Sequence, residues 1–229
     1  MLPWASKLGR PVPDFDFSVP GVTSMSADLH KYGFAAKGAS VVLYRSKDLR
    51  RHQYVTYADW PGGLYGSPSM PGTRPGGPIA AAWAVMQYLG EEGYLRVARE
   101  SLDVTDKILR GIREIPDLRV MGEPAMTIFA FDSPTLDVYA IADEMQKRGW
   151  HLDRQQKPPS LHMMITPAHA PHVDRILADL AASTAAVRTG GAVSEGSAAM
   201  YGMLGSLPDR GQVNDFILEF MDGLDQPSS

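Results

Sequence analysis

The first residue that could do chemistry is Lys31, in the stretch SADLHKYG. Residues 22–30 predict a short strand and the turn that leaves it, and ligands collect at strand ends in α/β sheets. A lysine amine becomes a nucleophile where desolvation leaves part of it neutral, which is the condition for Schiff-base chemistry. An ordinary solvated lysine also accounts for this motif, so the motif alone does not decide between the two.

Two further motifs combine a cation or a hydroxyl with glycine. Lys37 precedes Gly38 and Ser40, and such a group can hold a phosphate or a carboxylate; the alternative is a turn lysine before the next strand. Thr73 and Arg74 lie in GTRPGG, where glycine N–H groups can approach an anion closely. The alternative there is a purely structural loop. The absence of a GK[ST] signature argues against a nucleotide P-loop.

The remaining candidates for metal or thiol chemistry are weak. The sequence has no cysteine, which excludes disulfides, thiolate catalysis and iron–sulfur clusters. His169 and His172 are three residues apart, but Pro171 separates them and no third ligand is near in the sequence. His162 alternates within an apolar strand, which is typical of a packed histidine. We therefore predict no metal site.

Composition excludes several classes of protein. The 229 residues are 44% hydrophobic and 21% charged, as in globular proteins. The formal net charge of −4 argues against a nucleic-acid binder with a basic surface. The longest apolar stretch, Ile79 to Met86, is too short to span a bilayer, and the N-terminus lacks a signal-peptide pattern. We expect a soluble protein of a reducing compartment.

The segment at residues 60–78 must position the third motif, and its composition is unusual. It holds six glycines and five prolines in nineteen residues, which predicts a long functional loop and neither a helix nor a central strand. Pro78 suits the first turn of a helix. Apolar residues at helical spacing then predict one long helix to Ile112, with a break near Gly93.

The other expected elements flank these motifs. The first seventeen residues, with three prolines and no helical period, read as a connector. Strands at 127–132, 150–155 and 160–166 with helices at 136–149 and 172–188 predict a small α+β domain on an antiparallel sheet. The remaining expected elements are a strand at 39–45, a short helix at 47–54, a Gly/Ala/Ser-rich joint at 189–199 and a last helix at 211–224.

Taken together, the three motifs resemble a known family. SADLHKYGFAAKGASVVLYR is similar to the Schiff-base lysine segment of fold-type I pyridoxal-phosphate enzymes. More narrowly, it resembles the sphingosine-1-phosphate lyases, which are relatives of the group II amino-acid decarboxylases. The resemblance continues through DWPGGLYGSPSMPGTRPGG, the long helix, KPPSLHMMIT and AAMYGMLGSLPDRG, and so covers essentially the whole chain.

The resemblance implies a role for each motif. Lys31 would form the Schiff base with pyridoxal 5'-phosphate and later move protons, and His30 would lie by the cofactor phosphate. Lys37 would help to hold the substrate's phosphate. Thr73, where relatives often have serine, would reach a cofactor phosphate, that of the neighbouring subunit in a homodimer. Arg74 would brace the loop or approach the substrate.

The resemblance also implies an α/β fold, the C-terminal part of a fold-type I enzyme. Residues 1–93 would end the cofactor-binding large domain, 94–188 would form the connecting helix and the small α+β domain, and 189–229 a helical tail. The N-terminal half of the family, with the aspartate for the pyridinium nitrogen, has no counterpart in this sequence. We therefore expect an N-terminally truncated chain whose activity alone is doubtful.

The implied reaction is cleavage of a phosphorylated sphingoid base to a long-chain aldehyde and phosphoethanolamine, by a cytoplasmic homodimer. Two alternatives stay open. One is a pyridoxal-phosphate-dependent amino-acid decarboxylase, against which Lys37 argues. The other is an inactive truncated paralogue that binds and regulates a full-length lyase.

Overall fold

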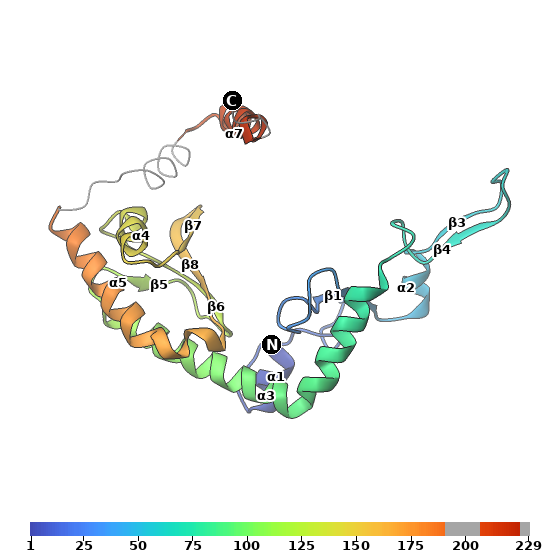
Figure 1. Ribbon diagram of the computed structural model, residues 1–229, viewed down its shortest axis with the longest axis horizontal. Helices are drawn as coiled ribbons and strands as arrows, with labels where there is room; N and C mark the ends of the chain where they lie inside the picture. Colours follow the sequence, from blue (N-terminus) through green and yellow to red (C-terminus); the bar gives the residue numbers. More distant parts are fainter. Residues whose placement is uncertain (191–206, 225–229) are drawn as a thin grey trace. The chain divides into compact units, whose positions relative to one another are not determined.

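The computed structural model describes residues 1–190 and 207–224 (Figure 1). The chain divides into two compact units, unit 1 over Met1–Arg99 and unit 2 from Glu100 onward. The three-part division expected from the sequence, with boundaries after residues 93 and 188, stays a prediction.

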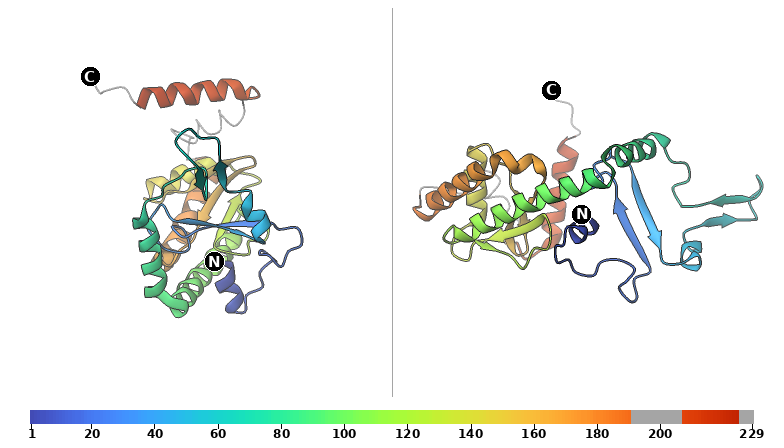
Figure 2. Two further views of the ribbon diagram at one scale, coloured as in Figure 1. Left: turned by 90° about the vertical axis from the view of Figure 1, so that its right-hand side faces the viewer. Right: turned by 90° about the horizontal axis from the view of Figure 1, so that it is seen from below.

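Unit 1 is built on two separate two-stranded ribbons. β1 (Ser24–Asp28) pairs antiparallel with β2 (Ser40–Tyr44), so both expected strands are confirmed (Figure 2). α2 (Lys47–Arg51) follows, as predicted. The second ribbon pairs β3 (Val55–Tyr57) with β4 (Tyr65–Ser67). The 60–78 segment is therefore not loop throughout, because part of it forms a hairpin strand between its prolines.

The N-terminus of unit 1 corrects another expectation. Residues 1–17 are not connector alone, because α1 spans Leu2–Lys7. Pro3 lies in the first turn of α1, where its missing N–H breaks no helical hydrogen bond. The Trp4 ring stacks on Tyr94 with 5.1 Å between ring centroids. This contact gives a short helix an apolar partner that the sequence pattern did not reveal.

The long helix is confirmed as α3 (Gly76–Glu114), and Pro78 lies in its first turn. It is two helices joined across Gly90, whose φ of 57° and ψ of −172° are not helical. The break predicted near Gly93 therefore falls three residues earlier. A positive φ costs glycine nothing, which explains why the break occurs at this residue type.

Unit 2 contains a four-stranded antiparallel sheet in the order β5-β6-β8-β7. Its strands and helices confirm the expected small α+β domain, with β5 and a short 3-10 helix, η1, as additions. The elements are β5 (Arg119–Val120), β6 (Ile128–Asp132), α4 (Val138–Lys147), β7 (Asp153–Gln156), β8 (Pro159–Met164), η1 (Pro167–His172), α5 (Val173–Arg188) and α7 (Arg210–Leu224).

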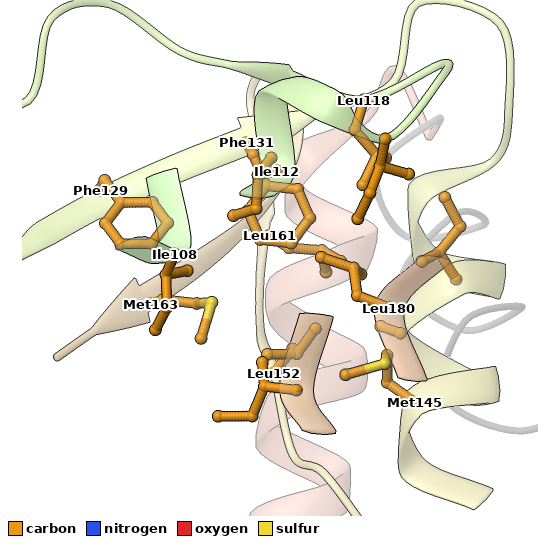
Figure 3. Close-up of a cluster of buried hydrophobic side chains, with 14 of the residues drawn as sticks. Ile108, Ile112, Leu118, Phe129, Phe131, Met145, Leu152, Leu161, Met163 and Leu180 are labelled. Atoms are coloured by element: carbon orange, nitrogen blue, oxygen red, sulfur yellow. The ribbon is translucent and has the colours of Figure 1, made fainter. Parts of the chain in front are cut away.

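One face of this sheet carries the core of unit 2. Phe129 pairs with Met163 and Phe131 with Leu161 across β6 and β8, and all four side chains are buried. They form one cluster with apolar residues of the second half of α3, of α4 and of α5 (Figure 3). Alternation along each strand sends these side chains to the helix-covered face.

Two sequence expectations fall partly on undescribed residues. The joint at 189–199 lies, from residue 191 on, outside the described residues, as does most of the AAMYGMLGSLPDRG segment. Over residues 1–190 and 207–224, no helix has the length and apolarity to cross a membrane.

Candidate active site

Lys31 lies in a tight turn that leaves β1. The Lys31 N–H donates to the Asp28 carbonyl at 3.1 Å, and the Ala35 N–H donates to the Leu29 carbonyl at 3.0 Å. Gly33 closes this turn, because a Cβ there would overlap the Leu29 carbonyl oxygen. The buried Tyr94 of α3 donates its hydroxyl hydrogen to the Gly33 carbonyl at 2.8 Å. The turn is therefore fixed both by its own backbone and by α3.

The Lys31 side chain is 67% exposed, and its amine lies 2.6 Å from Asp28 Oδ2. The other oxygen of Asp28 accepts a hydrogen bond of 2.6 Å from the Ser40 hydroxyl. Asp28 and Ser40 face each other at the last register position of the β1–β2 ribbon. The bonds from Lys31 and then Ser40 lower the pKa of the Asp28 carboxyl below its usual value. The carboxylate is thus ionised at neutral pH and holds the amine.

Asp28 is the functional candidate that sequence reasoning missed. Its place three residues before Lys31 was visible, but this spacing acquires meaning only with the strand register. A carboxylate at the end of β1 reaches a lysine in the following turn because the turn brings the chain back over the strand end.

His30 is half-buried beside Lys31. Its Nδ1 lies 2.9 Å from the Ala39 carbonyl oxygen. A carbonyl oxygen only accepts, so Nδ1 carries the hydrogen of this bond. This contact holds the ring against the residue that precedes β2.

The second and third motifs meet at the start of α3. Gly38 has a φ of 104°, and a Cβ there would lie 3.2 Å from Pro78 Cγ. Lys37 is exposed on the preceding residue, and Thr73 and Arg74 are exposed in the segment that leads to α3. The second motif therefore lies against the start of α3 through the approach of the Gly38 backbone to the Pro78 ring.

A cavity of about 800 Å³ lies within unit 1, and Arg74 is the predicted site residue that lines it. Gly38 contributes from the turn and Ser40 from the first position of β2. Most of the lining is apolar. Lys31, His30, Lys37 and Thr73 are outside the lining set that the described residues form.

The site residues carry the chemical groups that pyridoxal phosphate requires. Its aldehyde reacts with a primary amine, and Lys31 presents one at an exposed strand end. Its phosphate binds to ammonium, guanidinium and hydroxyl groups. Lys37, Arg74 and Thr73 present these groups at exposed positions. Among the described residues, no group of three or more His, Asp or Glu side chains could hold a metal ion. The absence of a metal site stays a prediction.

The chain is similar to sphingosine-1-phosphate lyases over nearly its whole length. It is 48% identical to the Arabidopsis thaliana lyase over 223 residues, 97% of this chain and 41% of that protein. It is 42% identical to the Saccharomyces cerevisiae lyase over 217 residues, 93% of this chain and 37% of that protein. The chain thus spans about two fifths of these relatives. No family model matches the sequence.

Solved structures agree. The sphingosine-1-phosphate lyase of Burkholderia pseudomallei superposes with a TM-score of 0.85 at 38% identity, over all of this chain and 48% of that one. Glutamate decarboxylase of Lactobacillus brevis superposes with a TM-score of 0.62 at 14% identity, over 75% of this chain and 42% of that one, a likeness of fold alone. The chain therefore has the fold of the C-terminal part of a fold-type I pyridoxal-phosphate enzyme and is a homologue of that part of the sphingosine-1-phosphate lyases.

Proposed function

We propose that this chain provides the lysine-bearing part of a pyridoxal-phosphate-dependent lyase. The enzyme would cleave a phosphorylated sphingoid base to a long-chain aldehyde and phosphoethanolamine. The observation that carries the proposal is the exposed Lys31, held by Asp28 at the end of β1, in a chain 48% identical to a named sphingosine-1-phosphate lyase.

Pyridoxal phosphate, when bound, supplies an electron sink for charge at the carbon that bears the substrate amine. Lys31 would hold the cofactor through its amine and would return a proton after cleavage. Asp28 holds the Lys31 amine in the turn whenever the amine is free, at 2.6 Å in the structure. His30, whose ring is held by the contact of Nδ1 with the Ala39 carbonyl oxygen, would lie by the cofactor phosphate.

The second and third motifs bind the phosphates of the cofactor and the substrate. Lys37 binds the substrate phosphate, Thr73 reaches a cofactor phosphate, and Arg74 braces the segment before α3 or approaches the substrate. The contact of Gly38 with Pro78 supports this grouping, because it sets the Lys37 backbone beside the start of α3. We also propose that the active form is a cytoplasmic homodimer in which Thr73 serves the neighbouring subunit.

The proposal is tested by locating the cofactor. The purified chain is incubated with pyridoxal phosphate, reduced with borohydride and analysed by peptide mass spectrometry. We expect label on Lys31 and its loss in Lys31→Arg. Lys107 is a control within the same protein, since its amine is also exposed and paired with a carboxylate, that of Asp174. Equal labelling of Lys31 and Lys107 would overturn the assignment of Lys31.

Substrate class is tested on the chain together with the part of the Burkholderia lyase that the chain does not match. Release of a long-chain aldehyde from a phosphorylated sphingoid base, lost in Lys31→Arg, is the expected result. Lys37→Ala should weaken turnover of the phosphorylated base more than that of an unphosphorylated amine. Release of carbon dioxide from an amino acid instead would identify a decarboxylase.

A further inference from the structure

A concentration of positive charge follows directly after β2. Residues 45–52, RSKDLRRH, include α2 and carry four Lys or Arg side chains against a single Asp. All four cations are exposed, namely Arg45, Lys47, Arg50 and Arg51. The whole chain has a formal net charge of −4, so this segment has the opposite sign to the chain as a whole. A local excess of one sign attracts ligands of the other sign.

Two of these cations are held in place by groups that carry no net charge. Arg45 donates from Nε and Nη2 to two backbone carbonyl oxygens, those of Val22 and Val19, at 2.6 and 2.8 Å. The Arg50 guanidinium lies 5.7 Å from the centroid of the Tyr54 ring. In the described part of the chain, neither arginine forms an ion pair with an Asp or Glu side chain, and the lysine between them in the sequence forms none either. Their positive charge is therefore not compensated by a carboxylate.

Three of the four cations line one hollow of about 420 Å³. Arg45, Lys47 and Arg50 line it together with Ser46 and the end of β2. We call the hollow and these three cations the basic pocket. Like charges that line one hollow repel one another, and a bound anion offsets this repulsion. Guanidinium and ammonium groups are donors that suit the oxygens of a phosphate.

The basic pocket is separate from the candidate active site. Asp28, which holds Lys31, faces Ser40 at one end of the β1–β2 ribbon. Tyr44 ends β2 at the other end, and Arg45 follows it. At roughly 3.3 Å per residue, about 13 Å of strand separates the two ends. The groups proposed above for the phosphates of cofactor and substrate are thus a different set of residues.

We propose that the basic pocket binds a phosphate group with two negative charges, either free phosphate or the phosphomonoester headgroup of a lipid. A dianion compensates three cations better than a carboxylate, which brings a single charge. Arg45 can contribute because the two backbone carbonyls engage only two of its five N–H donors. The proposal depends on neither cofactor nor cleavage, so failure of the aldehyde-release assay would leave it standing.

A nucleic acid fits this pocket less well. Its phosphodiesters bring one charge each and are spread along a strand, whereas the three cations line one hollow. The net charge of −4 also repels an extended polyanion beyond the pocket. A compact dianion meets the cations without approaching the rest of the surface.

The first test is an NMR titration of the ¹⁵N-labelled chain with inorganic phosphate at low ionic strength. We expect saturable shifts of the amides of residues 45–50, and no such shifts with sodium chloride at the same ionic strength. Shifts confined to residues 31–40 and 72–77 would place the phosphate at the candidate active site and would overturn the proposal.

Sedimentation with lipid vesicles separates the two sources of phosphate. The vesicles contain phosphatidylcholine alone, or with phosphatidic acid, or with phosphatidylserine at matched surface charge. Stronger binding to phosphatidic acid than to both others supports a lipid headgroup. Saturable shifts with inorganic phosphate, without a preference for phosphatidic acid, support free phosphate. A response to neither, or equal binding to both anionic vesicles without a phosphate titration, would contradict a phosphate site.

A matched pair of variants locates the site. Arg50→Gln and Arg51→Gln each remove one exposed positive charge from α2, but only Arg50 belongs to the basic pocket. We expect Arg50→Gln to weaken binding of the supported ligand about tenfold, through loss of a hydrogen bond to a charged group. Arg51→Gln should weaken it about twofold or less at an ionic strength that screens distant charges. Circular dichroism checks that both variants keep the fold. Equal weakening by the two variants would show attraction to general charge and would overturn the pocket.

Discussion

The predicted site residues and the larger hydrophobic core lie in different units of the chain. Unit 2 has a four-stranded sheet, covered by the second half of α3, by α4 and by α5, and a core cluster of twenty buried apolar residues. Unit 1 has two separate ribbons and a buried cluster of three alanines, yet it carries every predicted site residue. The residues suited to chemistry thus lie in the part of the chain that buries least apolar surface. Exposing reactive side chains and burying enough apolar surface for a stable core are different requirements that a sequence must meet.

Hydrogen exchange of the chain alone gives the largest expected contrast. We expect amides of β6 and β8 to exchange at least about a thousandfold more slowly than those of β1 and β2, because the former open only with a whole core. Mass spectrometry of peptides over the four strands measures this. Similar protection in both units would mean that unit 1 is stable by itself and would remove the distinction between them.

Loss of a core aromatic should affect unit 2 strongly. Phe131→Ala removes a fully buried ring and should lower the free energy of unfolding of unit 2 by about 3–5 kcal/mol. Trp83→Ala, in unit 1, removes a larger ring that is 63% exposed and should cost about 0.5 kcal/mol or less. Urea titration followed by circular dichroism compares the two. A Trp83 effect as large as that of Phe131 contradicts the comparison.

Gly33→Ala tests whether the turn in unit 1 is set by local backbone geometry. The added Cβ would overlap the Leu29 carbonyl oxygen, so the turn must shift at a cost of about 1–4 kcal/mol. We expect slower labelling of Lys31 by pyridoxal phosphate under reducing conditions. Gly66→Ala is the matched control, since a Cβ there meets no atom within 4 Å. Unchanged labelling in Gly33→Ala would show that the turn is adaptable.

The smallest effect concerns two carboxylates that each contact a lysine three residues later in the sequence. Asp28 in unit 1 and Glu144 in unit 2 both have a pKa below the usual range, through bonds first from Lys31 and Lys147 and then from Ser40 and Arg148. A lowered carboxyl pKa adds stability above the unfolded value, and that stability is lost as pH falls through the folded value.

Carboxyl NMR titration should therefore find the Asp28 midpoint below 3.8 and that of Glu144 below 4.5. Ser40→Ala should move the Asp28 midpoint upward and leave Glu144 in place. A midpoint for Asp28 at or above its ordinary value would mean that the Lys31 contact does not persist in solution.

Much of the fold could be predicted from the sequence because its elements have strong periodic patterns. α3, α4 and α5 place apolar residues at helical spacing, and β6 and β8 alternate. α1 was missed because its apolar partner, Tyr94, is far away in the sequence. β3 and β4 were missed because a three-residue strand containing Gly66 has no readable period.

The candidate site also has residues that could be predicted from the sequence and residues that could not. Lys31 could be named from its residue type and its place after an expected strand, whereas His30 was named only through the resemblance, which also supplied the role of each. The place of Asp28 in the site could not be predicted, because it depends on the register that sets Asp28 opposite Ser40. The roles of Lys37, Thr73 and Arg74 remain predictions, since they depend on bound anions.

The contact between Gly38 and Pro78 has a consequence for how such chains can diverge. Position 38 is restricted to glycine by its φ of 104° and again by the Pro78 ring 3.2 Å from any added Cβ. Gly38 and Pro78, forty residues apart, therefore constrain each other's substitution. A variant that kept Lys37 but changed Gly38 or Pro78 would retain the cation and lose the backbone that aims it.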